Sequence, residues 1–342
     1  MHFLSSLVSV LILAGNTAFA QQLSATTDFK GWFNVTEFPD QQKENVTRYL
    51  GEALRTAGAD LYPHFRHRCQ ASQVYSTLAN AQQSSGFIRP AKPFDGVHFV
   101  GESFVSSWAF DIGDGNNGLV LVDALNNPDE VKGVVLPGLA KFGYKGSDIR
   151  AIIITHEHAD HYGGVRYLQD TFGIPAYATK DAWDVLEAGD PVGPKGLVPP
   201  FRNETLTDGQ ELTFGNTTFS FVHTPGHTEG TVSFFVPVMD NGEKHLAGFY
   251  GGGGIPATAK AMGQQIASFE KFAGKAKEKG ADVLMSNHQT QDNSIYNFDL
   301  IAAGVSVTNP FVIGTDAYVR YLKTMSLCVR VKAARDGQLL SI

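Results

Sequence analysis

The segment THEHADHYGG, residues 155–164, places three imidazoles and an aspartate within six positions, at His156, His158, Asp160 and His161. The segment follows AIIIT, whose apolar run predicts a short buried strand. On an extended chain the i, i+2 spacing of His156 and His158 points both imidazoles to one side. Asp160 and His161 stand where a helix is expected to begin, so they approach from another direction. Imidazole and carboxylate both bind zinc, which predicts a metal site. The alternative is a helix cap beside a solvated histidine cluster.

The cluster is too compact for all four side chains to bind one ion comfortably. Two ions fit better, one for each half of the cluster, and each ion then needs further ligands. The candidates are His227, in HTPGHT after the strand-like TTFSFV, and His288, at the end of the strand-like VLMSN. Strand ends in α/β proteins gather at one edge of a sheet, where sites usually form. His223, the first residue of HTPGHT, is expected to pack in the turn or to support a ligand from behind.

The elements around these motifs alternate between strand-like and helix-like stretches, which predicts an α/β fold. Two similar halves, each mostly strands plus helices, suggest two sheets packed face to face with helices outside. We expect a catalytic domain over residues 94–309. Residues 21–93 contain polar, helix-forming stretches and predict an N-terminal helical extension, and residues 310–342 predict a helical tail.

The first 20 residues predict a secretory signal. An apolar run from Leu7 to Ala14 precedes Ala18-Phe19-Ala20, which is a small-residue cleavage pattern. The run is too short to span a bilayer as a stable helix, and no other segment is long and apolar enough for one. We therefore expect a secreted protein, and a buried N-terminal helix is the alternative.

Export would place the two cysteines, Cys69 and Cys328, in an oxidising compartment, where they form the one possible disulfide. Two buried free thiols are the alternative. Four N-x-[ST] sequons lie in polar or turn-like contexts suited to surface glycans. They begin at Asn34, Asn45, Asn203 and Asn216.

The formal net charge is −7 and the chain has no basic run, so nucleic acid is not an expected partner. A small-molecule substrate is expected, and no membrane partner. The sequence carries no sign that specifies an oligomeric state.

The pattern His156-x-His158-x-Asp160-His161, followed by HTPGHT and a distant histidine, resembles the metallo-β-lactamase superfamily over residues 94–305. Within it the chain looks most like the third subclass of class B β-lactamases. The resemblance implies a four-layer αβ/βα sandwich and two Zn²⁺ per subunit. It also implies that Asp123, in LVLVDA, supports the ligands from behind. The two implied ligand sets are His156, His158 and His227, and Asp160, His161 and His288.

The resemblance and the ligand set imply that a metal-bound hydroxide opens a cyclic amide or ester, with Asp160 as the catalytic residue that orients the hydroxide. Thioesterases, lactonases and many phosphodiesterases of the superfamily carry an aspartate that bridges both metals after HTPGHT. Here residues 247–256 read AGFYGGGGIP, without an acid, which favours a lactamase-like site. A thioesterase, a phosphodiesterase and a non-catalytic zinc-binding relative are the alternatives.

Residues that contact the substrate are harder to assign than the metal ligands. The lactamase subclass holds its substrate carboxylate with serines near the position of Gly251–Gly254. The backbone amides of these glycines would replace them, since glycine lets the backbone approach a ligand closely, or the segment is a plain turn. Phe104 and Trp108, and Phe201 in the loop over 188–205, are candidates for aromatic pocket walls, but such rings belong more often to the core.

Overall fold

The computed structural model describes most of the chain, namely residues 40–75, 79, 86, 88–113, 115, 118–189, 196–305 and 308–340. The predicted signal over residues 1–20 and the sequon at Asn34 lie outside the described residues. Within the described part, no helix combines the length and the apolar character needed to cross a membrane.

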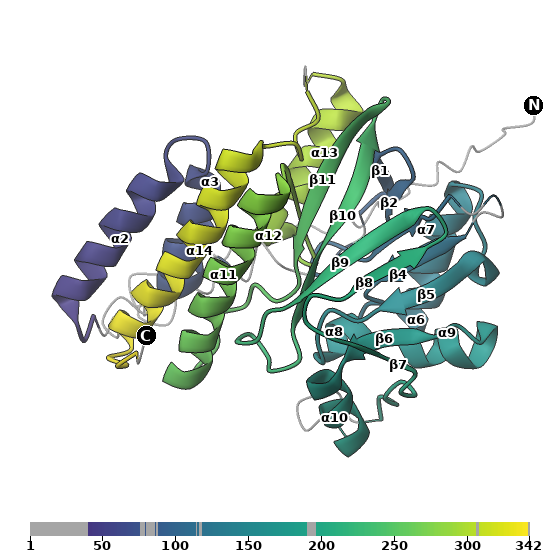
Figure 1. The fold of residues 1–342 in the computed structure, drawn as a ribbon, viewed down its shortest axis with the longest axis horizontal. Helices are drawn as coiled ribbons and strands as arrows, with labels where there is room; N and C mark the ends of the chain where they lie inside the picture. Colours follow the sequence, from purple (N-terminus) through teal and green to yellow (C-terminus); the bar gives the residue numbers. More distant parts are fainter. Residues whose placement is uncertain are drawn as a thin grey trace, which may run out of the picture.

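Two mixed sheets form the centre of the described structure (Figure 1). The first has the order β1-β2-β3-β4-β5-β6-β7, with parallel pairing from β4 to β7, and the second has the order β12-β11-β10-β9-β8, with only β11 and β12 parallel. The strands of the first sheet are β1 (Ala91–Phe94), β2 (Val97–Phe99), β3 (Trp108–Asp111), β4 (Leu119–Val122), β5 (Ile149–Ile153), β6 (Ala176–Thr179) and β7 (Glu204–Leu206). Those of the second are β8 (Glu211–Phe214), β9 (Thr217–His223), β10 (Val232–Asp240), β11 (Glu243–Tyr250) and β12 (Val283–Ser286).

Helices cover the outer faces of both sheets, and this completes the predicted four-layer αβ/βα sandwich. On the first sheet lie α6 (Pro128–Glu130), the π-helical η2 (Val131–Val135), α7 (Leu136–Lys141), η3 (Gly146–Asp148), α8 (Ala159–Tyr162), α9 (Val165–Phe172) and α10 (Lys180–Ala188). The other helical elements are α2 (Lys43–Ala57), α3 (Tyr62–Phe65), the π-helical η1 (Arg66–Ala71), α4 (Ser72–Val74), α11 (Ala259–Lys279), α12 (Gln289–Asp292), α13 (Ser294–Ala303) and α14 (Thr315–Arg335).

Phenylalanine rings fill the space between the two sheets. Phe110 of the first sheet packs edge-on against Phe219 of the second, and Phe234 stacks on Phe249 at 4.7 Å. Burial of such rings is the main driving force for this packing, at about 25 cal/mol per Å² of apolar surface. Strand β10 is almost entirely buried because sheet and helix cover its two faces, whereas β8 alternates exposed and half-buried residues at the sheet edge.

The helical stretch over residues 128–141 is not one continuous α-helix. It is divided into α6, η2 and α7, and it ends at Lys141. Pro137 has no N–H to donate to the preceding turn, and the wider π-helical turn of η2 directly precedes it.

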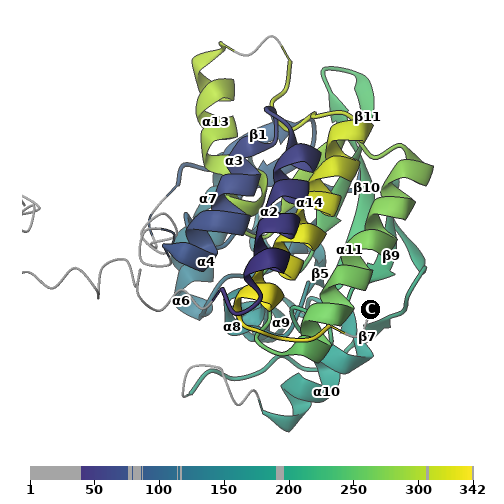
Figure 2. The same ribbon diagram turned by 90° about the vertical axis from the view of Figure 1, so that its left-hand side faces the viewer.

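The N-terminal and C-terminal helices pack on each other and on the second sheet. Helix α2 lies against α14, and α14 against α11, and together they form one core cluster (Figures 1 and 2). The predicted bridge between Cys69 and Cys328 is present, with both residues fully buried, and it joins η1 to α14. In the chain-entropy model a closed loop this long contributes about 4–5 kcal/mol. The domain boundaries after residues 93 and 309 remain predictions.

The three sequons in the described residues differ in accessibility. Asn203 and Asn216 are exposed, whereas Asn45 in α2 is half-buried. The Nδ2 of Asn216, the atom that would carry a glycan, donates a hydrogen bond of 2.7 Å to the carbonyl of Gly113. Glycosylation at these sites remains a prediction.

His98 makes the stability of the fold depend on pH. Its ring is buried at 4.4 Å from Phe142 and 5.2 Å from Tyr144, and within the described residues neither ring nitrogen has a hydrogen bond. Burial, aided by the charge of Lys92, lowers the pKa of His98 to about 4. Between pH 4 and about 6.5 the unfolded chain therefore binds a proton that the folded chain does not, so the free energy of unfolding falls as the pH falls.

We expect His98→Phe to keep the ring contacts and to abolish this contribution. The free energy of unfolding of the variant relative to the wild type should then rise by up to about 1.4 kcal/mol per pH unit as the pH falls from 6.5 toward 4. Denaturant unfolding at several pH values measures this difference. A constant difference across that range would contradict the assignment.

Candidate metal centre

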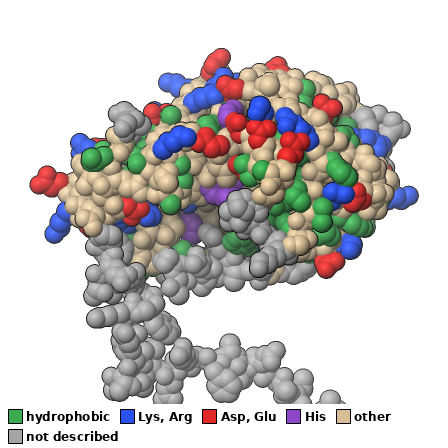
Figure 3. Space-filling model, turned by 90° about the horizontal axis from the view of Figure 1, so that it is seen from below, with side chains coloured by type: hydrophobic (Ala, Val, Ile, Leu, Met, Phe, Trp, Pro, Cys, Tyr) green, Lys and Arg blue, Asp and Glu red, His purple; other side chains and the backbone are tan. Residues whose placement is uncertain are grey.

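Loops at the carboxyl ends of several strands meet at one end of the sandwich. They follow β4, β5, β9, β11 and β12, and they carry Asp123, His156, His227, Gly251 and His288. The view from below in Figure 3 shows histidine side chains in a hollow of the surface. Parallel strands such as β4 and β5 end at the same edge of a sheet, which explains why these loops converge.

The structure groups six of the predicted residues into two triads. His156, His158 and His227 form one, and Asp160, His161 and His288 form the other. In each triad the potential ligand atoms all lie within 4.8 Å of one another. The rings of His156 and His161 lie 4.0 Å apart, so the two triads are adjacent.

Hydrogen bonds at Nδ1 orient four of the five histidines. His156 and His227 each lie 2.9 Å from a backbone carbonyl, that of Gly251 and that of Gly254 respectively. His288 Nδ1 lies 2.8 Å from the carbonyl of Phe104, and His161 Nδ1 lies 2.7 Å from the Asp123 carboxylate. An Nδ1–H that donates to such an acceptor leaves the Nε2 lone pair free for a metal.

The chemistry of these donors fits a pair of bound cations. The Nε2 of His156 is buried and has no hydrogen-bond partner within the described residues. Two acids, Asp123 and Asp160, lie in the same place, and no described lysine or arginine forms an ion pair with either. Buried charge of this kind is retained when it is paired or coordinates a metal.

The pKa values of three of the histidines follow the same pattern. Burial, aided by the neighbouring histidines, lowers the pKa of His156 and His227 well below the usual range and that of His288 to about 4. These rings are therefore neutral near pH 7, as metal ligands must be. Burial alone would raise the pKa of Asp160, but the nearby His161 and His288 outweigh it and lower that pKa, so Asp160 is ionised. Burial alone would lower the pKa of His161, but the carboxylates of Asp160 and Asp123 outweigh it and raise that pKa to about 10.

Asp123 holds this arrangement together from behind. Its carboxylate accepts hydrogen bonds from the amide and hydroxyl of Thr155, both 2.8 Å long, as well as contacting His161. Asp123 is fully buried and has a φ of 59°, which is uncommon for a residue with a side chain. Strain of this kind persists only where the surroundings impose it, commonly at functional sites.

Asp123→Asn should weaken metal binding by about 10- to 100-fold, because an amide cannot accept all three hydrogen bonds. Competition with a chelator measures the change, and Asp129→Asn, on the exposed surface of α6, is the matched control. Unchanged metal affinity in Asp123→Asn would refute the supporting role.

The Gly251–Gly254 segment supports the ligands through its carbonyl groups. The carbonyls of Gly251 and Gly254 hold His156 and His227, and the amide of Gly251 donates to the hydroxyl of Ser233. At Gly254 an added Cβ would lie closer than 3.0 Å to the His227 ring, a distance that real Cβ atoms essentially never show. These glycines are required because the backbone contacts the ligand rings directly, so the segment is more than a plain turn.

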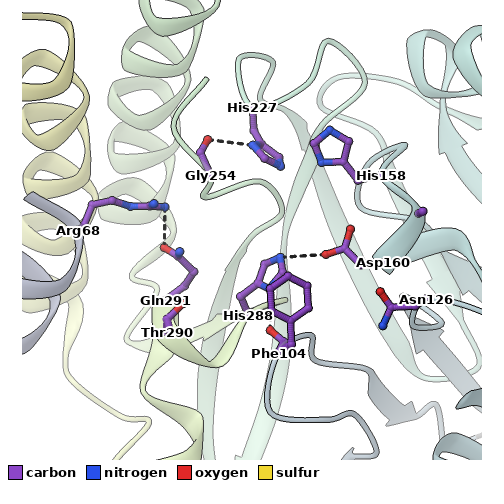
Figure 4. Close-up of a pocket in the computed structure, with 11 residues that line it drawn as sticks. Arg68, Phe104, Asn126, His158, Asp160, His227, Gly254, His288, Thr290 and Gln291 are labelled. Carbon is purple, nitrogen blue, oxygen red and sulfur yellow. Dashed lines mark hydrogen bonds and ion pairs between the residues drawn. The ribbon is translucent and has the colours of Figure 1, made fainter. Parts of the chain in front are cut away.

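A cavity of about 480 Å³ opens beside the triads (Figure 4). Its walls include His158, Asp160, His227 and His288 together with Phe104, whose ring lies 5.3 Å edge-on from His288. The expectation that Phe104 lines the pocket is confirmed.

Trp108 and Phe201 do not line this cavity. The core interpretation is confirmed for Trp108, whereas Phe201 lies neither in the core nor in the cavity wall. Trp108 is fully buried between the sheets, and its indole N–H donates to the carbonyl of Ser286. Phe201 is 53% exposed and stacks under the Arg166 guanidinium at 3.6 Å. In the described part of the loop, residues 196–205, no side chain reaches the cavity.

His223 is not joined to the ligands. Its Nε2 lies 2.8 Å from the carbonyl of Glu229, and its side chain is partly exposed beside Asp181. The Pro-Gly turn separates it from His227, so it packs in the turn and does not support a ligand.

Two supporting residues were missed at the sequence level. Glu157, inside THEHADHYGG, accepts hydrogen bonds from the hydroxyl of Thr228 and the amide of Gly230, and so ties the two histidine loops together. Asn287 donates to the carbonyl of Gly251 and the hydroxyl of Thr155. Their position beside a predicted ligand was the only available signal.

Comparisons with known proteins agree with this geometry. A family model described as the metallo-beta-lactamase superfamily matches residues 100–240. A hydroxyacylglutathione hydrolase of Hamiltonella defensa subsp. Acyrthosiphon pisum is 31% identical over 38% of this chain and 43% of its own length. The chain thus spans less than half the length of that curated relative.

Solved structures resemble a larger part of the chain. The subclass B3 metallo-β-lactamase BJP-1 of Bradyrhizobium japonicum has a TM-score of 0.60 and 26% identity, covering 72% of this chain and 94% of its own. A variant of the metallo-β-lactamase FEZ-1 from Legionella gormanii has a TM-score of 0.60, covers 71% of this chain and 94% of its own, and at 18% identity shows the shared fold alone.

Proposed function

Because a metallo-β-lactamase superfamily model matches residues 100–240, we propose that this protein is a secreted dinuclear zinc hydrolase that opens a cyclic amide or ester. The two adjacent triads of potential ligand atoms carry the proposal. One zinc would be held by His156, His158 and His227, and the other by Asp160, His161 and His288. Zinc, when bound, supplies a Lewis acid that activates water and polarises a carbonyl group.

The residues around the cavity prepare it for this reaction. Asp160 Oδ2 lies 3.2 Å from His161 Nε2 and 3.5 Å from His288 Nε2, and its side chain remains 20% exposed at the cavity. An ionised carboxylate there accepts a hydrogen bond from the attacking water and orients it toward a substrate carbonyl. Asn126, on the same side of the cavity, is held by Glu102 and Glu130, and the ring of Phe104 shields the site from bulk water.

Secretion is supported by the signal-like residues 1–20 and by the buried bridge between Cys69 and Cys328. Disulfides persist in oxidising compartments. Detection of the protein in the culture medium of its source, with its N-terminus at Gln21, tests this part of the proposal.

A thioesterase is the second candidate, because the similarity to a hydroxyacylglutathione hydrolase supports it. The acid-free sequence over residues 247–256 argues against it. No side chain at Gly251–Gly254 can bridge two metals, and the carbonyls of Gly251 and Gly254 already hold ligand histidines.

One experiment tests the function and separates the two candidates. Zinc is counted in the purified, zinc-loaded protein, and turnover is screened on β-lactams, γ-lactams, lactones, thioesters and phosphodiesters. We expect two zinc ions per chain and hydrolysis of a lactam or lactone. His227→Ala should lose both metal and turnover, whereas His223→Ala, in the same motif, should keep them. Fewer than two zinc ions with no turnover on any class would refute the proposal.

A further inference from the structure

A buried arginine forms part of the cavity wall without an acidic partner. Arg68, in η1, is 7% exposed and lines the cavity beside the triads. Within the described residues it forms no ion pair, and its hydrogen bonds run from Nη2 to the carbonyl of Gly253 and to Gln291 Oε1. Burial lowers the pKa of Arg68 to about 10, so the guanidinium is still charged at neutral pH. A buried charge without a counter-charge is costly.

The position of this arginine is built into the fold. The next residue, Cys69, is bridged to Cys328 of α14, and the carbonyl of Arg68 accepts hydrogen bonds from the side chains of Ser72 and Gln73. The terminal helices and the disulfide thus hold the guanidinium in place at the wall of the cavity.

Arg68 and the His227 triad share one stretch of backbone. The carbonyl of Gly253 accepts from Arg68, and the next carbonyl, that of Gly254, holds His227. Consecutive Cα atoms are about 3.8 Å apart, so the guanidinium lies within small-molecule reach of the triad. Figure 4 shows Arg68 and Gln291 on one side of the cavity and Asp160 and Asn126 on the other.

We propose that Arg68 binds a carboxylate of the acyl substrate while the substrate carbonyl lies at the two triads. The substrate class is then an anionic cyclic amide or ester, which deepens the proposed function and rests on it. The hydrogen bonds of Arg68 within the described structure all use Nη2, so the N–H groups of Nε and Nη1 remain for a ligand. Both edges of a guanidinium that can donate two parallel hydrogen bonds include Nη2, so the substrate carboxylate would accept a charge-assisted hydrogen bond from Nη1.

The substrate carboxylate belongs at the Arg68 end of the cavity, where the guanidinium has no acidic partner among the described residues. The serines that hold the carboxylate in the resembled lactamase subclass are absent from Gly251–Gly254. Arg68 would supply the missing recognition from an element outside the sequence range of the resemblance.

The test uses thiol probes, because thiolates bind zinc strongly. Their binding can be measured without any turnover by the protein. A series of ω-mercaptocarboxylates and their matched amides is titrated calorimetrically into the zinc-loaded, full-length protein. For the best chain length, the acid should bind about 10- to 100-fold more tightly than its amide, as expected for a hydrogen-bonded ion pair. In Arg68→Gln this ratio should fall close to 1, with the affinity for the amide unchanged within about twofold.

Two further variants separate recognition from support. Arg335→Gln removes another arginine that is 7% exposed and that donates to the carbonyl of Cys69, away from the cavity, and it should keep the wild-type ratio. Gln291→Glu keeps the guanidinium but places a carboxylate of the protein beside it, so the ratio of acid to amide affinity should fall in this variant too. This variant tests the proposal even if Arg68→Gln does not fold. An unchanged ratio in Arg68→Gln or in Gln291→Glu would overturn the proposal. Equal loss of affinity for the acid and the amide would also overturn it, because it would show that Arg68 only supports Gly253.

These measurements distinguish this proposal from the proposed function. If the acid-to-amide ratio depends on Arg68 but no lactam or lactone is hydrolysed, the hydrolase proposal fails and the anion site stands. If the wild type and Arg68→Gln both hydrolyse a lactam acid as fast as its methyl ester, the proposal of an anion site fails and the proposal of a hydrolase is retained.

Discussion

Replacing Asp160 with asparagine is expected to lower turnover by about 1000-fold or more, equivalent to about 4 kcal/mol of transition-state stabilisation. The substitution keeps the shape of the side chain and removes its charge. The carboxylate contacts both His161 and His288 and faces the cavity, so its loss affects one metal and the orientation of water together. Steady-state kinetics on the best substrate and zinc counting measure the two effects, and we expect about one zinc ion to remain.

The matched control is Asp170→Asn, which removes an exposed carboxylate that pairs with Arg166 on α9. Exposed pairs contribute little to stability, so this variant should retain two zinc ions and wild-type turnover. Turnover that survives in Asp160→Asn would mean that the reaction takes place at another site.

Gly254→Ala is expected to lower the affinity for one zinc ion, and with it turnover, by about 10- to 100-fold. A methyl group here would lie closer than 3.0 Å to the His227 ring, which the carbonyl of the same residue holds. Either the ring or the backbone must move, and loss of such support commonly costs 10- to 100-fold in metal affinity. Metal titration against a chelator and kinetics on the same samples measure both losses.

Gly274→Ala provides the matched glycine control. Gly274 lies in α11, and an added Cβ meets no atom within 4 Å. Alanine favours a helix over glycine by about 1 kcal/mol, so this variant should be slightly more stable and fully active. Normal metal binding in Gly254→Ala would show that the Gly251–Gly254 backbone moves to accept the methyl group and that a glycine is not required at this position.

Much of the metal centre could be predicted because its residues are close together in the sequence or stand in short, specific motifs. The spacing of His156, His158, Asp160 and His161 needed only one strand and one turn to become a cluster, and the structure places them so. Strand ends converge at the edge of a sheet, which also brought His227 and His288 within range.

Other features could not be predicted, because each depends on contacts between distant segments. Trp108 and Phe201 were candidates for a pocket wall or for the core, and the packing of whole sheets and loops placed Trp108 in the core and left Phe201 exposed. The glycines of 251–254 allowed several interpretations, and the histidine rings that pack on them show why side chains are excluded.

What the sequence by itself determined is the chemistry: five histidines and an aspartate in local patterns that specify donor types and approximate directions. Only the tertiary structure decided what surrounds that chemistry. Arg68 lies 185 residues from the carbonyl that it contacts, and the disulfide that anchors its neighbour spans 259 residues. Local sequence encodes short-range geometry through strand and turn preferences, whereas a cavity wall is formed by long-range packing, for which a single residue type carries no signal.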